Sequence, residues 1–72
     1  MSVARLRKRS LALAGHSTSL ALEPEFWGVL EDLARTRNLS LAALIGAIDA
    51  ERGERPLASA CRLTALDFAK TR

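Results

Sequence analysis

Several residue types are scarce in this chain, and each scarcity argues against a class of protein. The 72 residues include one cysteine, so no disulfide can form within the chain, and we expect a reducing compartment. No stretch approaches the roughly 20 apolar residues of a membrane span. The apolar run Leu11 to Ala14 is much shorter than the roughly 7–15 residues at the core of a secretory signal. We therefore expect neither a membrane protein nor an exported one.

Residue patterns that carry catalysis or bind metals are also missing. His16 is the one histidine and lies far along the chain from Cys61, so the ligand spacing of a metal site is absent. No nucleophile elbow or phosphate-binding loop surrounds the serines. We interpret Cys61 as an inert core residue, with a reactive or intermolecular thiol as the alternative. The sequence predicts a binding protein with no catalytic residue, cofactor or metal.

Acidic residues are absent before Gly15, although the whole chain carries a net charge of only +3. The same segment contains four basic residues, Arg5, Arg7, Lys8 and Arg9. We expect residues 1–9 to form a flexible basic arm that neutralises phosphates and releases counterions. The alternative is a solvated terminus that only aids solubility.

After Gly15 the sequence alternates as a half-buried strand does. The alternation predicts an inner face and an outer face, formed respectively by Thr18, Leu20 and Leu22 and by Ser17, Ser19 and Ala21. We identify no second convincing strand, and we interpret Gly15 as a bend that turns residues 10–14 away. An unpaired strand favours an antiparallel ribbon between two copies of the chain. Residues 10–72 are expected to form one domain, of a size at which oligomerisation commonly adds stability.

The rest of the chain has helical periodicity in three segments. Pro24 suits the start of the first helix, and Asn38 suits its left-handed end. Ser40 has the chemistry of an N-cap for the second helix, which ends near Gly53. A third helix is expected from about Leu57 to Lys70.

A short strand, a helix, an Asn-Leu-Ser junction and a second helix together resemble the ribbon-helix-helix family of DNA-binding proteins. The resemblance extends from Arg9 to Leu66 and is closest to a bacterial subgroup of small proteins. It is carried by the fragments Arg9-Ser10, Gly15-His16, Thr18-Ser19, Leu20-Ala21-Leu22-Glu23 and Phe26-Trp27. The resemblance implies a mostly α-helical, intertwined homodimer with a two-stranded intermolecular ribbon, here extended by a C-terminal helix.

The resemblance also implies roles for particular residues. The outward strand residues that would face DNA bases are Ser17, Ser19 and Ala21, whose small side chains carry little of the bidentate base code. Backbone amides at the start of the second helix would bind phosphate at Ser40, Leu41 and Ala42, although a plain N-cap at Ser40 is the alternative we favour. The expected dimer core comprises Thr18, Leu20, Leu22, Phe26, Trp27, Leu30, Leu44, Ile45 and Ile48.

Two residues keep alternative interpretations. For His16 we rank a structural hydrogen bond first, DNA contact second and a metal role third. For Trp27 we favour a core anchor over a platform on which bases stack, because it lies within the apolar stripe of the first helix.

We predict a dimeric, sequence-specific transcriptional regulator of the bacterial cytoplasm, associated with the nucleoid, whose partners are its own second copy and double-stranded DNA. Dimers that assemble further along an operator are included in this hypothesis. The alternative is a protein-interaction module, such as an antitoxin-like partner or an adaptor, that keeps the dimer fold with little base readout. The small residues at Ser17, Ser19 and Ala21 favour the alternative, and the basic arm favours the regulator.

Overall fold

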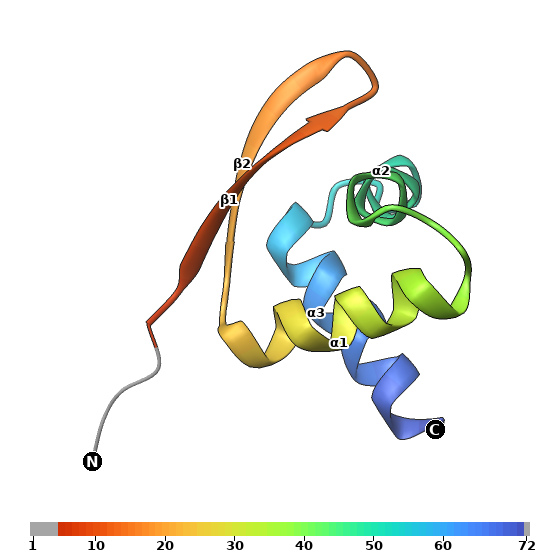
Figure 1. Ribbon diagram of the computed structural model, residues 1–72. Coiled ribbons are helices and arrows are strands. Elements are labelled where there is room, and N and C mark those ends of the chain that lie inside the picture. Colours follow the sequence, from red (N-terminus) through yellow and green to blue (C-terminus); the bar gives the residue numbers. More distant parts are fainter. Residues whose placement is uncertain (1–4, 72) are drawn as a thin grey trace.

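The computed structural model describes residues 5–71 and places a two-stranded antiparallel ribbon before three helices (Figure 1). The ribbon consists of β1 (Arg7–Leu13) and β2 (His16–Leu22). It is followed by helices α1 (Pro24–Thr36), α2 (Leu41–Glu51) and α3 (Leu57–Lys70). The predicted fold class, a mostly helical chain with an N-terminal antiparallel ribbon and an additional C-terminal helix, is confirmed.

Both strands of the ribbon come from the same chain, which corrects one prediction. β1 and β2 are joined by Ala14 and Gly15, whose φ angles of 49° and 85° are both positive. Two central residues with positive φ form the turn whose twist matches that of paired strands. Gly15 therefore turns the preceding segment back onto β2 and not away from it, and the expectation of no second strand is wrong.

The basic segment is partly included in β1. Residues 7–9 of the predicted flexible arm belong to this strand, and residues 1–4 lie outside the described part of the chain. The sequence pattern does not reveal this strand, because its inward side chains are basic at Arg7 and Arg9 and become apolar only at Leu11 and Leu13. Only half of β1 therefore shows apolar alternation, and basic residues are not typical of strands.

The ends of α1 follow from its sequence. Pro24 begins the helix. At this position an N–H would have no partner inside the helix, and the fixed φ of proline is already helical, so proline costs no hydrogen bond. Asn38 has a φ of 57°, and the Leu39 N–H donates to the Ala34 carbonyl oxygen at 2.8 Å. This left-handed residue and six-to-one hydrogen bond form a Schellman motif, which ends α1 and turns the chain toward α2.

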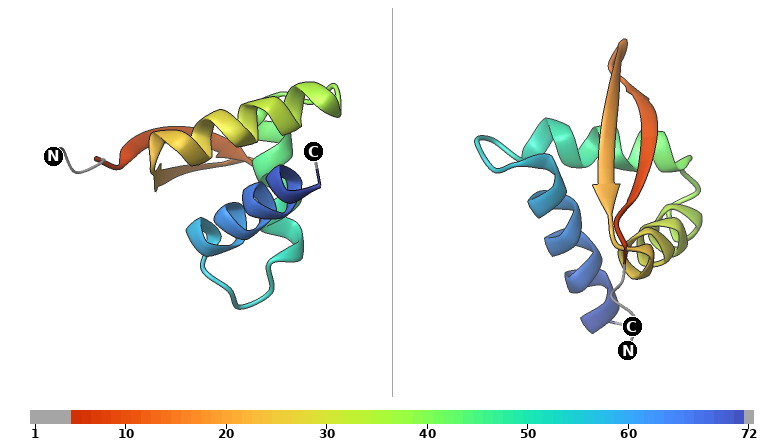
Figure 2. Two further views of the ribbon diagram at one scale, coloured as in Figure 1. Left: turned by 90° about the horizontal axis from the view of Figure 1, so that it is seen from below. Right: turned by 90° about the vertical axis from the view of Figure 1, so that its left-hand side faces the viewer.

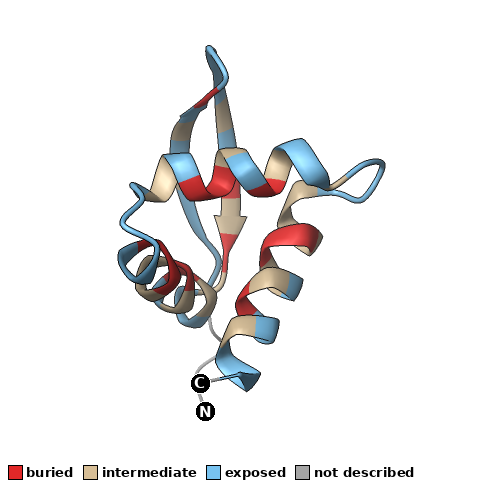
Figure 3. Cartoon of the chain, turned by 90° about the vertical axis from the view of Figure 1, so that its right-hand side faces the viewer, coloured by how far each residue is buried: buried red, intermediate tan, exposed pale blue. Residues whose placement is uncertain are grey.

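The three helices lie on one side of the ribbon, whose turn projects beyond them (Figure 2). α2 contacts β1, α3 contacts β2, and the three helices contact one another. Figure 3 shows the buried residues gathered where these elements meet. The core consists of Leu13, Leu20, Leu22, Trp27, Leu30, Leu33, Ala34, Leu44, Ile45, Ile48, Ala60, Cys61 and Ala65. Within residues 5–71, no helix has the length and apolar character needed to cross a membrane.

An ion pair fastens α3 to the junction between β2 and α1. The Arg62 Nε atom donates to Glu23 Oε1 at 2.8 Å, and its guanidinium also lies over the Phe26 ring. The hydrogen bond from Arg62 holds the pKa of Glu23 below its usual value. The end of the ribbon is thereby linked to a helix that lies far along the chain.

Candidate functional site

The ribbon has a polar outer face that no helix covers. Residues paired across the two strands point to the same side of a ribbon. The outer face consists of Lys8 paired with Ala21, Ser10 with Ser19, and Ala12 with Ser17. Ala21 is half-buried, and the other five side chains are exposed. The face therefore presents hydroxyls, methyls and one ammonium group, all on a short and regular scaffold.

The inner face packs on the helices within a single chain. Leu20 and Leu22 are buried against them, whereas Thr18 is half-buried. Other residues expected in a dimer core also lie in this core: Trp27, Leu30, Leu44, Ile45 and Ile48 are buried, and Phe26 is half-buried. One chain thus assembles a closed core from these residues without a second copy.

Arg9 differs from the other basic residues of the predicted arm. Its Nη2 atom donates to Glu31 Oε2 at 2.9 Å, and its guanidinium lies 4.8 Å from the centre of the Trp27 ring. Arg9 therefore already has an acidic and an aromatic partner within the fold. Arg5, Arg7 and Lys8 are exposed, and their side chains form no ion pair within residues 5–71. These three carry the positive charge that remains available at this end of the ribbon.

Trp27 joins the ribbon to α1. Its ring is 2% exposed, and its Nε1 donates to the Arg7 carbonyl oxygen at 2.9 Å. A buried ring whose one polar atom is satisfied by the backbone cannot offer its face to a nucleic-acid base. Trp27 therefore lies in the core and holds β1 in place.

The start of α2 is capped by its own sequence. The Ser40 hydroxyl oxygen accepts a hydrogen bond from the Ala43 N–H at 3.0 Å, as an N-cap does. Ser40 is exposed, while Leu41 and Ala42 are half-buried. The first N–H groups of any helix lack partners inside it, so this end of α2 keeps the partial positive charge that attracts anions.

His16 lies directly after the turn of the ribbon and is exposed. Its imidazole makes no hydrogen bond with residues 5–71, so the structural hydrogen bond ranked first for it is not formed there. The same residues contain no group of three or more His, Cys, Asp or Glu side chains that could hold a metal ion. His16 is thus a free side chain at the projecting end of the ribbon.

A groove of about 590 Å³ follows the unpaired edge of β2. It is lined by every residue from 16 to 21 and, on its far wall, by Asp49, Arg52, Leu57 and Ala58. Because β1 pairs with only one edge of β2, the backbone groups at the other edge have no strand partner among the described residues. The groove therefore gives access to a strand edge.

Cys61 takes no part in this surface. Its side chain is fully buried, and burial raises the pKa of its thiol to about 11, with the nearby charge of Asp49 acting in the same direction. Only the thiolate is an effective nucleophile, so a buried thiol with a raised pKa is unreactive at neutral pH.

Sequence reasoning did not identify two features of the structure. Ser10 and Ala12 were missed, and Lys8 was expected in a flexible arm and not on the outer face, because β1 itself was missed. A second cavity is lined by three arginines from the ends of α1 and α2 and from the following loop, and no sequence spacing relates Arg37 to the other two. A signal for β1 does exist in the weak alternation of residues 10–13, which a two-residue turn would extend.

The comparisons with known proteins give one match. A family model described as a ribbon-helix-helix domain matches residues 6–69, which is nearly the whole chain. No curated protein and no solved structure gave a significant match.

Proposed function

Because the chain belongs to the ribbon-helix-helix domain family, whose members commonly bind DNA as dimers, we propose that it is a dimeric, sequence-specific transcriptional regulator. The observation that carries this proposal is the uncovered outer face of the ribbon, opposite the helices. A two-stranded β-ribbon fits the major groove of B-DNA, where each base pair presents a distinct pattern of donors and acceptors. Domains of this family are typically not enzymes.

The outer face would supply limited base discrimination. Ser17 and Ser19 offer hydroxyls that donate or accept, Ala21 offers a methyl group, and Lys8 of the neighbouring strand adds one longer donor. Hydroxyls can contact several bases, whereas bidentate arginine or amide contacts select one. Pairs of dimers on adjacent half-sites would add specificity that one ribbon lacks.

Phosphate contacts would provide most of the affinity. Arg5, Arg7 and Lys8 are exposed beside the ribbon and form no ion pair within residues 5–71. The backbone amides at Ser40, Leu41 and Ala42 begin α2, where a helix N-terminus attracts phosphate. Such contacts fix the register of a protein on the duplex without reading its sequence.

Dimerisation would occur along the free edge of β2. In a two-residue hairpin the closing pair, Leu13 and His16, exchanges hydrogen bonds, so the backbone groups of Ser17, Ser19 and Ala21 point to the open edge. Antiparallel pairing with a second β2 overlaps all seven residues when Ser19 lies opposite its own copy. The product is a four-stranded sheet with both β2 strands at its centre and a doubled outer face.

A cysteine pair tests this arrangement. Ser19→Cys would place two thiols across a hydrogen-bonded pair with Cα atoms about 5.5 Å apart, within the range of a disulfide. The matched control is Ala12→Cys, which is also exposed on the outer face but lies on β1. In this register its two copies are three strand spacings apart across the sheet and four residues apart along it, so roughly 20 Å separates their Cα atoms. Rapid oxidation of only the Ser19→Cys variant to a covalent dimer supports the register. Equal rates for both variants, or a monomer in sedimentation, contradict it.

The function itself is tested by selecting bound fragments from a sheared bacterial genomic library. The selection is run at about 150 mM salt with excess competitor DNA, so that phosphate attraction alone does not retain fragments. A few recovered fragments that share a repeated or palindromic element would support a sequence-specific regulator. Uniform recovery, or none, would contradict it. The regulator would act in the bacterial cytoplasm, in association with the nucleoid.

A protein-interaction module is the second candidate function. Two observations favour it: the short side chains at Ser17, Ser19 and Ala21, and the exposure of Leu63 and Leu66 on α3, at 46% and 52%. Residues three apart are neighbours on a helix, so these leucines form one apolar patch, and a contiguous apolar patch marks a surface that binds another protein. If genomic selection recovers nothing while Leu63→Ser abolishes capture of a defined protein partner, the interaction module replaces the regulator.

A further inference from the structure

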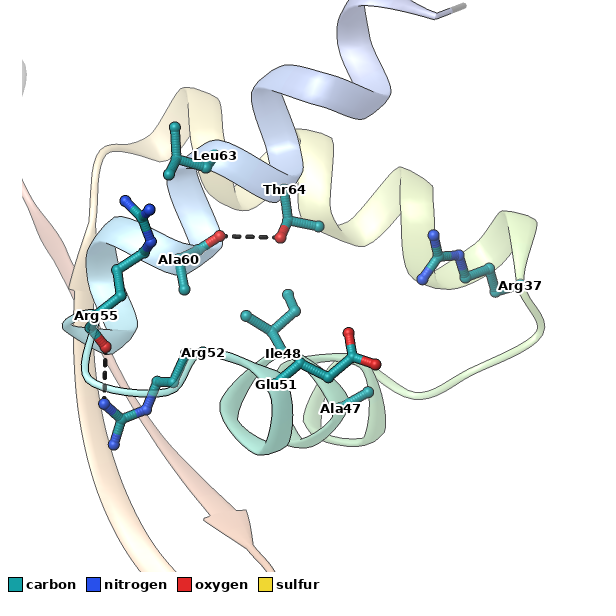
Figure 4. Close-up of a pocket in the computed structure, with 9 residues that line it drawn as sticks. All are labelled: Arg37, Ala47, Ile48, Glu51, Arg52, Arg55, Ala60, Leu63 and Thr64. Carbon is teal, nitrogen blue, oxygen red and sulfur yellow. Dashed lines mark hydrogen bonds between the residues drawn. The ribbon is translucent and has the colours of Figure 1, made fainter.

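A cavity of about 330 Å³ lies where the end of α1 meets α2, α3 and the loop between them (Figure 4). We call it the arginine cavity. It contains no residue of the ribbon and is separate from the proposed DNA-binding surface. Its lining residues are Arg37, Ala47, Ile48, Glu51, Arg52, Arg55, Ala60, Leu63 and Thr64.

The base of the arginine cavity is apolar with one polar group. Ile48 and Ala60 are 9% and 7% exposed, and Leu63 at the rim is 46% exposed. The Thr64 hydroxyl donates to the Ala60 carbonyl oxygen at 2.9 Å, which leaves its own oxygen able to accept a hydrogen bond. A ligand that fills this space would cover aliphatic surface that water now contacts.

Two guanidinium groups at the rim are free to bind. Arg37 and Arg55 come from opposite sides of the cavity in Figure 4, and neither side chain forms an ion pair within residues 5–71. Arg37 is the C-cap of α1, so the end of that helix fixes the position of its backbone. Both side chains are exposed and need not break an internal contact to reach a ligand.

Arg52 fixes the loop that carries Arg55. Its Nε donates to Asp49 Oδ1 at 2.6 Å, and its Nη1 donates to the Arg55 carbonyl oxygen at 2.8 Å. The Arg55 N–H in turn donates to the Arg52 carbonyl oxygen at 3.1 Å. The charge of Arg52 is therefore matched by Asp49, while the loop holds Arg55 at the rim.

Glu51 is the one acidic residue in the lining, and it is exposed. With Arg52 paired to Asp49, two unpaired arginines face one carboxylate, so the cavity keeps a positive potential. A guanidinium binds a carboxylate through a planar fork of two N–H groups. An apolar base beneath such groups selects a ligand that has an apolar body as well as a negative charge.

We propose that the arginine cavity binds a small monocarboxylate with a short aliphatic or aromatic body. The carboxylate engages Arg55 at the rim, Arg37 on the opposite side adds to the positive potential, and the body lies on Ile48, Ala60 and Leu63. The volume of about 330 Å³ is at the lower end of the range for small-molecule pockets, so the ligand is compact. The proposal uses no residue assigned to DNA contact, although Arg52 also lines the groove at the β2 edge and Leu63 also belongs to the surface of the second candidate function.

Titration of the full chain with 3-phenylpropionate, followed by amide NMR at low ionic strength, tests the proposal. We expect saturable shifts confined to amides that line the cavity, such as those of Ile48, Leu63 and Thr64. The neutral analogue 3-phenylpropanamide has the same body, and we expect it to bind at least about 10-fold more weakly, as for the loss of one charged interaction of about 1.4 kcal/mol. Equal binding of the two compounds, or linear shifts spread over the surface, would overturn the proposal.

Three substitutions locate the interaction. Arg55→Gln and Glu51→Gln change exposed side chains, so both variants should fold, which the dispersion of their amide spectra verifies. Arg55→Gln should weaken 3-phenylpropionate binding about 10-fold, whereas Glu51→Gln should tighten it because a repulsive charge is lost. The matched control Lys70→Gln removes one exposed positive charge near the end of α3 and should change the affinity less than about 2-fold.

Two results would overturn the assignment. If Lys70→Gln weakens 3-phenylpropionate binding as much as Arg55→Gln does, the affinity depends only on the net charge of the protein and not on the cavity. If Arg37→Gln combined with Arg55→Gln dissociates a dimer in sedimentation and leaves 3-phenylpropionate binding unchanged, the cavity is a protein contact and not a ligand site.

Discussion

The indole Nε1 of Trp27 donates a hydrogen bond of 2.9 Å to the Arg7 carbonyl oxygen, and this bond joins the first residue of β1 to the first half of α1. Arg9 covers the same ring from the next inward position of the strand and pairs with Glu31 of the helix. The ribbon is therefore held at its open end by one tryptophan and one arginine, and at its other end by the turn.

Replacing Trp27 with phenylalanine should destabilise the fold. The smaller ring leaves space in the core and removes the donor to the Arg7 carbonyl, so we expect a loss of roughly 2–4 kcal/mol in the free energy of unfolding. Urea unfolding followed by circular dichroism measures it. Arg9→Gln is the control, and because Arg9 and Glu31 are partly exposed we expect it to cost less than about 1 kcal/mol. Similar losses in the two variants would contradict the role given to the indole.

The turn of the ribbon offers a stabilising change. Ala14 has a φ of 49°, a region that disfavours residues with a Cβ atom and that asparagine tolerates better. Ala14→Asn creates an Asn-Gly pair, the preferred sequence for this turn, and should raise the free energy of unfolding by about 0.5–1 kcal/mol. Gly15→Ala should lower it by about 1 kcal/mol or more, because φ is 85° there although the added Cβ would meet no atom within 4 Å. Unchanged melting temperatures in both variants would contradict this.

Gly28 is a second site where stability can be gained. It lies within α1 and is exposed, and apart from its chain neighbours and the backbone of its own helix no atom lies within 4 Å of the position that a Cβ would occupy. Gly28→Ala should therefore raise the free energy of unfolding by about 0.8–1 kcal/mol, which is the difference in helix propensity. Thermal unfolding measures this gain, and a decrease would show that another molecule approaches the helix at this point.

The basic residues beside the ribbon should contribute unequally to DNA binding if the proposed function holds. Replacing Arg5, Arg7 and Lys8 with alanine should weaken binding to all duplexes and reduce the slope of log K against log salt by about 0.9 for each phosphate that the variant no longer neutralises. Arg9→Ala should change this slope less, because Arg9 is paired with Glu31 and stacked on Trp27. Ser17→Ala with Ser19→Ala should alter sequence preference at constant slope.

Two outcomes would contradict this account. The variant that lacks Arg5, Arg7 and Lys8 could bind DNA as tightly as the parent, or Arg9→Ala alone could reduce the salt slope as much as that triple variant does. Lys70→Ala serves as the control for a loss of charge away from the ribbon.

The thiol of Cys61 should make stability depend on alkaline pH. Its pKa is about 11 in the folded chain against an ordinary value of 9.0, so the unfolded chain releases this proton first as the pH rises. The contribution is fully present below pH 9 and is lost between pH 9 and pH 11. By pH 10 the loss should be about 1.4 kcal/mol, measured by urea unfolding at each pH. Cys61→Ala should lack this component, and parallel pH curves for the two proteins would contradict the prediction.

The helices were predictable because each carries its own signals. Pro24, Asn38, Ser40 and Gly53 occupy helix ends or the turn after a helix, and each has the backbone or capping chemistry that its position requires. The inward face of β2 was predictable for a similar reason, since the alternation from Ser17 to Leu22 allows only one assignment of faces.

The first half of β1 was not predictable, because contacts with α1 stabilise it. Arg7 and Arg9 read as a charged tail, yet the aromatic ring and carboxylate that support them come from α1. The turn has Ala14 where asparagine or aspartate would have indicated a hairpin. The arginine cavity was not predictable for the same reason, since Arg37 lies across from Arg52 and Arg55 only after the three helices have packed.

Trp27 is the single tryptophan of the chain, and its place under the ribbon gives the protein an internal optical probe. Its indole is buried, hydrogen-bonded to β1 and covered by the Arg9 guanidinium. The wavelength of tryptophan fluorescence should therefore depend on whether β1 is packed against α1. Detachment of the ribbon would hydrate the ring and shift its fluorescence to longer wavelength while helical circular dichroism persists. Movement of the ribbon can thus be followed in real time without any label.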